Sequence, residues 1–294
     1  MSVKRIIIDE DAGPCGGVKR VIQLSEKNIA QGYKTASLGP VVHNSNEINR
    51  LEILGLEAVD YSEFDRVEQG GDKRRVVIRA HGEAPEVFER AEKLGLEVVD
   101  GTCPVVIRSQ KFARKYYDRG YQVVVVGKPY HAEVIGIVGH CNHEAKVVHD
   151  EADADQLDPD KPTYVLAQTT ISEDMFNTML AAIRKRVKHV VHRNTICAFV
   201  SDREDELRIF ADEHDVILFV GGRNSSNTNV MHQVCLSANP RSYWIESIDD
   251  VELDWFENAE SVGISGSAST PQWLLEKVGE ELAERLHVEP ATQS

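Results

Sequence analysis

The sequence predicts an α/β protein made of three related repeat units, and two observations carry that prediction. Cys15, Cys103 and Cys197 are each followed 28 positions later by a polar residue, which is His43, His131 or Ser225. Short apolar runs, such as VVVV at 123–126 and VILFV at 216–220, alternate with segments of helical periodicity. Because self-similarity at a fixed spacing indicates structural repeats, we expect three homologous units whose equivalent ends meet around one axis.

The same spacing sets the expected boundaries. We expect the first unit to comprise residues 1–102, with Cys15, His43 and His81. The second comprises residues 103–195, with Cys103, His131, Glu133 and Thr169. The third comprises residues 196–287, with Cys197, Ser225 and Ser269. His81 and Thr169 both lie 66 positions after their cysteines, and Ser269 lies 72 after its own. Residues 288–294 are expected to be a disordered tail.

The first unit shows its elements in order. Val18, Val21 and Ile29 form a helical stripe after Cys15, and Gly32 ends that helix. A strand follows in TASLGPVVH, and Asn44 with Glu47 predicts a capping box for the next helix, with Ser45 as the alternative cap. RRVVIRAHG is another strand, the segment from Pro85 to Leu94 a helix, and EVVDGTC the strand that leads to Cys103.

The other two units repeat this plan. The second has a helix at 104–119, the strand YQVVVVGKPYH that leads to His131, and the strand YVLAQTT that leads to Thr169. The third has a helix at about 201–213 and the strands in VILFVGGRNSSN and VGISGSAST. In parallel α/β sheets, ligands bind beyond the carboxyl ends of the strands, where helix N-termini point. The repeated polar residues all follow such strand ends, which predicts a shared site.

Charge and composition exclude some functions. The 294 residues carry a formal net charge of −15, which argues against nucleic acid and anionic membranes as partners. An anionic substrate must therefore be held by local donors. The N-terminal MSVKRIIIDE reads as a strand, not as a signal peptide. We expect a cytoplasmic protein with reduced thiols.

The repeated cysteines are candidate metal ligands. A lone cysteine is more often a small buried hydrophobe, and Cys141 and Cys235, which lie outside the repeat, are left in that class. The three repeated cysteines instead sit in turns with the sequences GPCGG, GTCP and NTIC. Three thiolates leave one coordination position open, as catalytic sites do. Both an iron–sulfur cluster and zinc satisfy this pattern.

The remaining repeated residues form a candidate anion pocket. Three histidines and three hydroxyl residues offer neutral or switchable donors, and NSSN at 224–227 precedes a helix where phosphate oxygens could bind. Taken alone, each histidine could instead be a hydrogen-bonded structural residue beside a helix N-terminus. The NSSN segment could instead be an ordinary helix N-cap. Glu133 lies two residues after His131; burial beside an anion would raise its pKa and make it a general acid. The alternative for Glu133 is a surface carboxylate at a helix N-terminus.

Nine short motifs together resemble one family along nearly the whole chain. They are AGPCGGVKR, LGPVVHN, RAHG, GTCP, HAEVIG, AQTT, NTIC, NSSNTN and SASTP. The set resembles the 4-hydroxy-3-methylbut-2-enyl diphosphate reductases, iron–sulfur enzymes of the methylerythritol phosphate route to isoprenoids. No single motif is specific for that family, but the set is.

The resemblance implies a trefoil around a 4Fe–4S cluster held by Cys15, Cys103 and Cys197, whose fourth iron binds the substrate hydroxyl. It implies a proton relay at Glu133 assisted by Thr169. The positions that match diphosphate-binding residues are His43, His81, His131, Ser225, Ser226, Asn227 and Ser269. The products would be isopentenyl and dimethylallyl diphosphate, and the electron donor a ferredoxin or flavodoxin.

The sequence departs from the family pattern at a few positions. After NTIC it has Ala198, Phe199 and Val200, where the family usually has a threonine at the third place. Glu204 replaces a usual glutamine, Gly101 a usual alanine, and GSAS at 266–269 the usual AGAS. Two alternatives therefore stay open: a diverged paralogue that reduces another phosphorylated allylic alcohol, and a non-catalytic cluster or zinc protein that acts as a sensor.

Overall fold

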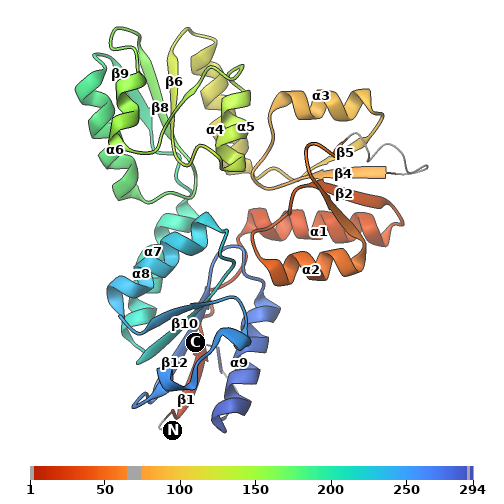
Figure 1. Ribbon diagram of the computed structural model, residues 1–294, viewed down its shortest axis with the longest axis vertical. Coiled ribbons are helices and arrows are strands. Elements are labelled where there is room, and N and C mark those ends of the chain that lie inside the picture. The colour runs from red at the N-terminus through yellow and green to blue at the C-terminus, as the bar shows by residue number, and fades with distance from the viewer. Residues whose placement is uncertain (1–2, 65–73, 290–291, 294) are drawn as a thin grey trace. The chain divides into compact units, whose positions relative to one another are not determined.

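The computed structural model describes residues 3–64, 74–289 and 292–293 and has the expected α/β class, with three parallel sheets (Figure 1). The chain forms two compact units. The first contains Met1–Lys19, Val42–Ile53 and Ala198–Ser294, and the second contains Arg20–Val41 and Leu54–Cys197. No helix among the described residues has the length and apolar character needed to cross a membrane.

One sheet of the second compact unit has the order β3-β2-β4-β5. Its strands are β2 (Lys34–Leu38), β3 (Leu56–Val59), β4 (Arg74–Ile78) and β5 (Glu97–Asp100). Helix α3 (Pro85–Lys93) packs Ala91, Val87 and Phe88 on buried strand residues such as Val76 and Ile78. Helix α1 (Gly16–Ala30) buries Val21 beside Gly101, directly after β5.

The other sheet of this compact unit, with the order β7-β6-β8-β9, is covered on both faces. Its strands are β6 (Gln122–Val126), β7 (Lys146–Val148), β8 (Thr163–Ala167) and β9 (Val190–Arg193). Val124 and Val126 pack against helix α6 (Glu173–Arg186), whereas Val123 and Val125 pack against the helices on the other face, α4 (Pro104–Tyr117) and α5 (Ala132–Gly139) (Figure 1). Burial on both faces explains the unbroken VVVV run, because successive strand side chains point to opposite faces.

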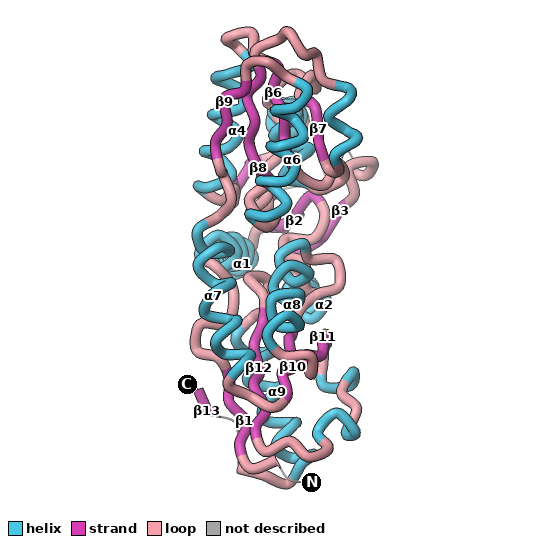
Figure 2. Tube along the Cα trace, turned by 90° about the vertical axis from the view of Figure 1, so that its left-hand side faces the viewer, coloured by secondary structure: helices cyan, strands magenta, loops and turns pink. Residues whose placement is uncertain are grey.

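The sheet of the first compact unit has the order β11-β10-β12-β1-β13. Its strands are β1 (Arg5–Ile8), β10 (Val216–Val220), β11 (Ser242–Ile245), β12 (Ser261–Gly266) and β13 (Thr292–Gln293). Figure 2 shows β1, β10 and β12 side by side with helix α9 (Gln272–Leu286) beside them. Leu275, Val278 and Leu282 of α9 share one core with the strands. The remaining helices of this unit are α2 (Ser45–Leu54), α7 (Ala198–Asp212) and α8 (Ser226–Ala238).

Three details differ from the sequence expectation. The strand at the N-terminus, β1, pairs with β12 of the third repeat instead of joining the sheet of the first repeat. Part of the expected tail is ordered, since Thr292 and Gln293 pair with Ile7 and Ile8. Asn44 caps α2 through a hydrogen bond from the Glu47 amide (3.0 Å), but the Glu47 carboxylate binds Arg50 and Trp273. The repeat boundaries at 102/103 and 195/196 stay predictions.

Candidate active site

The 28-residue spacing corresponds to one structural position in each sheet. The amides of Gly39, Gly127 and Gly221 each donate to the last carbonyl of the neighbouring strand, at distances of 2.8, 3.1 and 2.9 Å. Four residues beyond these glycines lie His43, His131 and Ser225. His131 and Ser225 are the N-caps of α5 and α8, whereas His43 lies one residue before the Asn44 cap of α2.

The three repeated cysteines also share a backbone position. The amide of each donates to a carbonyl two residues beyond a strand end: Cys103 to Ala80 (3.0 Å), Cys197 to Thr169 (2.9 Å), and Cys15 to Ala268 (3.3 Å). Thr169 is therefore equivalent to Ala80 and Ala268. In the first and third sheets the residues one position after this carbonyl are His81 and Ser269. Thr169 therefore shares the 66-residue spacing with His81 but does not occupy the same structural position.

The thiols of these cysteines differ from the other two in burial. Cys15, Cys103 and Cys197 are half-buried at the start of helices, and no disulfide involves any of the five cysteines. Cys141 and Cys235 are buried, and burial raises the pKa of each thiol to about 12. A metal needs the thiolate, so the accessible trio fits a thiolate-bound centre and the buried pair does not.

Glu133 is a buried acid whose carboxylate is bound by Thr169. Only 1% of its surface is exposed. Its Oε1 accepts from the Thr169 amide (2.8 Å), and its Oε2 accepts from the Thr169 hydroxyl (2.7 Å). Burial raises the pKa of Glu133 to about 7, and the two Thr169 hydrogen bonds oppose that rise. Since the Thr169 carbonyl accepts from Cys197, one residue connects the acid to a candidate ligand.

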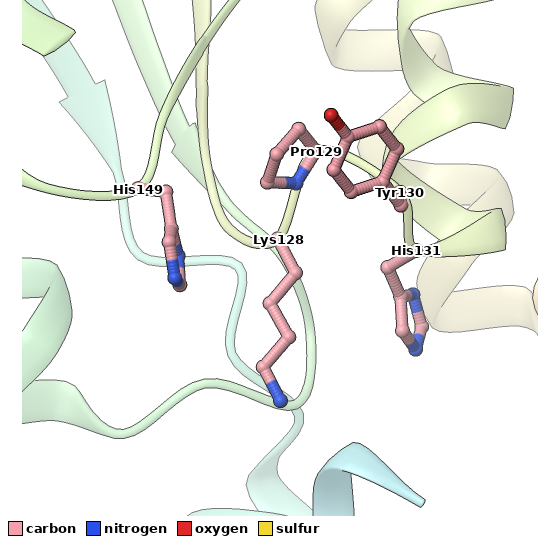
Figure 3. Close-up of a pocket in the computed structure, with 5 residues that line it drawn as sticks. All are labelled: Lys128, Pro129, Tyr130, His131 and His149. Atoms are coloured by element: carbon pink, nitrogen blue, oxygen red, sulfur yellow. The ribbon is translucent and has the colours of Figure 1, made fainter. Parts of the chain in front are cut away.

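His131 and His81 lie beside each other in the same compact unit. Their ring centroids are 5.3 Å apart in an edge-to-face arrangement. His131 Nδ1 accepts from the Glu133 amide (3.3 Å), so the neutral ring carries its proton on Nε2. His131 also lines a hollow of about 430 Å³, in which Lys128 extends between His149 and His131 (Figure 3). These groups supply donors at the carboxyl end of β6.

The first compact unit holds the hydroxyl residues. Ser269 contacts Ser225 (Oγ–Oγ 3.4 Å) and Ser267 (3.0 Å), and Ser267 contacts Thr270 (3.1 Å). Asn227 Oδ1 accepts from the Ala268 amide (2.8 Å), which fixes the loop that also binds Cys15. Ser225, Ser226 and Asn227 are buried at the N-terminus of α8, where backbone amides favour an anion.

Sequence reasoning missed two buried ion pairs beside the site residues. Arg79 binds Glu83 (2.9 Å), and both contact the Tyr61 hydroxyl, so this cluster brackets His81 in the chain. In the first compact unit, Arg203 pairs with Asp9, which also accepts from Ser265 (2.7 Å). The residues of these pairs are too far apart in the sequence, or too ordinary in type, to have shown a pattern.

Two departures from the family pattern have a packing explanation. A Cβ at Gly101 would lie 2.3 Å from the Ile78 carbonyl oxygen and 2.8 Å from Val21 Cγ2. One at Gly266 would lie 2.9 Å from Leu275 Cδ2. Val200 is buried, with 3% exposed, while Phe199 is 39% exposed. Close packing by these neighbours explains why glycine occupies positions 101 and 266.

The fold and the site together define an α/β enzyme with half-buried thiols, a buried acid of raised pKa and clusters of polar side chains at strand ends. The model of the LytB protein family matches residues 6–283. The chain therefore belongs to the LytB protein family, that of the 4-hydroxy-3-methylbut-2-enyl diphosphate reductases.

Relatives and solved structures agree with that assignment. The reductase of Chlorobaculum parvum is 39% identical, and the match covers 91% of this chain and 92% of the relative. The reductase of Phocaeicola vulgatus is 38% identical, with 92% and 96% covered.

A solved structure of (E)-4-hydroxy-3-methyl-but-2-enyl diphosphate reductase, the terminal enzyme of the non-mevalonate pathway, is 37% identical with a TM-score of 0.72; the match covers 96% of this chain and all of that one. The corresponding reductase structure from Plasmodium falciparum is 22% identical with a TM-score of 0.85, covers 99% and 92% of the two chains, and supports the fold. Family membership implies an iron–sulfur cluster.

Proposed function

We propose that the chain reduces 4-hydroxy-3-methylbut-2-enyl diphosphate to isopentenyl and dimethylallyl diphosphate, as its relatives are named for doing. The C–O bond breaks, a C–H bond forms, and the oxygen leaves as water, which consumes two electrons and two protons. The single observation that carries the proposal is Glu133: a buried carboxyl with a pKa of about 7, tied through Thr169 to Cys197.

Cys15, Cys103 and Cys197 would hold a 4Fe–4S cluster with one iron left open. Their half-buried thiols, at equivalent backbone positions, support this choice over Cys141 and Cys235. When bound, such a cluster supplies electrons and a Lewis-acidic iron for the departing oxygen. The convergence of the three thiols and the polar residues on one point stays part of the proposal.

Glu133 would supply a proton to the departing oxygen, because hydroxide is a poor leaving group and water a better one. With a pKa of about 7, a large fraction of Glu133 is protonated at neutral pH. Protonation lets Oε2 donate to the Thr169 hydroxyl, which can then donate its own proton onward. Thr169 would thus both position the acid and extend its reach.

The diphosphate would be held by neutral donors. His43, His81, His131, Ser225, Ser226, Asn227 and Ser269 are the proposed ligands. Charge from the protein as a whole repels an anion, so the His131 Nε2–H and the α8 N-terminus must act locally. We also propose a cytoplasmic location, where reducing conditions keep thiols available, and a ferredoxin or flavodoxin as electron donor.

Anaerobic turnover with cluster-replete protein and reduced methyl viologen tests the proposal. We expect both five-carbon diphosphates to form, and we expect Glu133→Gln to keep its iron but lose most turnover. A typical general-acid contribution predicts a loss of about 100- to 10,000-fold. An iron-replete protein without conversion would exclude this substrate, and unchanged turnover in the variant would exclude Glu133 as the acid.

A further inference from the structure

Positive charge is concentrated in two segments of this acidic chain. Residues 103–117 and 175–201 contain nine lysines and arginines and no aspartate or glutamate, while all 48 acidic residues lie elsewhere. All nine of these basic residues belong to the second compact unit, which ends at Cys197. The first begins at Cys103 and the second contains Cys197, so the acid-free regions coincide with two candidate cluster ligands.

The two segments meet at the surface between α4 and β9. The Arg193 guanidinium lies over the Phe112 ring, 4.1 Å from its centroid. Arg108, Lys111 and Lys115 are exposed and follow each other at spacings of three and four, so they form one stripe along α4. We call Arg108, Lys111, Lys115 and Arg193 the basic face.

A hollow of about 280 Å³ lies within the basic face. Its lining includes Arg108 and Arg193 as well as Val105 and Ile196, which are two residues from Cys103 and one from Cys197 in the chain. A molecule bound over this hollow would sit on the segments that carry both cysteines. Electron transfer weakens steeply with distance, so this placement suits the entry of electrons.

We propose that the basic face is the docking surface for an acidic electron-carrier protein of the ferredoxin or flavodoxin type. Complementary charge steers such encounters and sets their association rate, and complexes of redox proteins are small and transient. Each reduced carrier gives up one electron and leaves oxidised; two deliveries, with two protons, convert the allylic alcohol of the substrate to the alkenyl diphosphate products and water. The inference rests on the proposed function.

A charge-reversal variant tests the docking surface. The variant combines three substitutions in the exposed stripe of α4: Arg108→Glu, Lys111→Glu and Lys115→Glu. Glutamate is also a good helix former, and the contact of Arg193 with Phe112 is left in place. We expect kcat/KM for reduced ferredoxin to fall about tenfold or more at low ionic strength, with the difference shrinking as salt is added. Turnover with reduced methyl viologen and the KM for the diphosphate substrate should stay unchanged.

The matched control carries the same charge change elsewhere in the second compact unit. Lys27→Glu, Lys93→Glu and Lys146→Glu alter exposed positions on α1, α3 and β7. An equal loss in this control, no loss in the stripe variant, or a raised KM for the substrate would each overturn the docking surface, the last in favour of a substrate role.

Failure of the proposed function is distinguishable, because then the wild type would not turn over with methyl viologen either. Salt-dependent binding of oxidised ferredoxin to the wild type and not to the stripe variant would still support the docking surface in that case. A short DNA duplex tests whether the basic face binds any polyanion. If the DNA competes with ferredoxin at comparable affinity, the basic face is a general polyanion site and the proposal is overturned.

Discussion

Thr169 binds both carboxylate oxygens of Glu133, one through its amide and the other through its hydroxyl. The buried carboxyl consequently has its hydrogen-bond needs met by a residue 36 positions away in the chain. Burial alone pushes the pKa of Glu133 upward, and these two bonds limit the rise to about 7. The balance between them sets the pH range in which Glu133 can act as an acid.

Thr169→Val should move the alkaline limb of the pH–rate profile to higher pH. The isosteric change removes the hydroxyl that stabilises the carboxylate, so the pKa of Glu133 rises further above its ordinary value. Because the acid acts when protonated, turnover then persists to higher pH. The measurement is kcat with methyl viologen as a function of pH. Thr169→Ser keeps the hydroxyl and should leave the limb in place; a limb that moves to lower pH in Thr169→Val would contradict the assignment.

Single cysteine substitutions should separate ligands from packing residues. Cys15→Ser, Cys103→Ser and Cys197→Ser each remove one proposed thiolate, so we expect iron and sulfide per chain to fall sharply after anaerobic reconstitution. Cys141→Ala and Cys235→Ala serve as controls, because these thiols are buried with raised pKa values. Loss of iron in either control, with the fold intact by circular dichroism, would refute this division.

Asp9→Ala should destabilise the first compact unit strongly. The change removes the buried carboxylate partner of Arg203, whose side chain is 7% exposed, and leaves the longer contact with the Glu206 carboxylate (3.5 Å). Removal of one partner from a buried ion pair costs about 3–5 kcal/mol of unfolding free energy. Urea denaturation followed by circular dichroism measures the loss. The exposed pair of Asp160 with Lys188 provides the control, and Asp160→Ala should leave the midpoint unchanged within error. Equal effects of the two substitutions would argue against the buried pair as a stabilising element.

Gly101→Ala should be destabilising even though alanine is usual at that place in the family. The added methyl would meet the Ile78 carbonyl oxygen, and overpacking of this kind costs about 1–3 kcal/mol. Gly136→Ala is the matched control, since its nearest neighbours would lie 3.4–3.6 Å away and alanine favours helix α5. Thermal unfolding compares the two. A Gly101→Ala protein as stable as the wild type would show that the strand end can adjust.

Much of the fold was predictable because its signals are local. Alternation of apolar strands with helical stripes gave the α/β class, and β6 and β10 lie where the valine- and isoleucine-rich runs are. Pro85 and Pro104 open helices α3 and α4, as the preference of proline for the first turn predicts. The expected tail failed in part because pairing of Thr292 with Ile7 depends on a strand nearly the whole chain away.

By itself the sequence determined which residues share a structural position. The repeated cysteines lie at one such position, and the 28-residue spacing brings His43, His131 and Ser225 to another, because these positions follow from the local order of strand, turn and helix. Tertiary structure alone decided which side chains from distant parts of the chain are in contact. It paired Glu133 with Thr169, joined Asp9 to Arg203 across 194 positions, and packed Arg193 on Phe112 to unite two basic segments. Contacts between distant segments depend on how sheets and helices pack, and no local pattern encodes that packing.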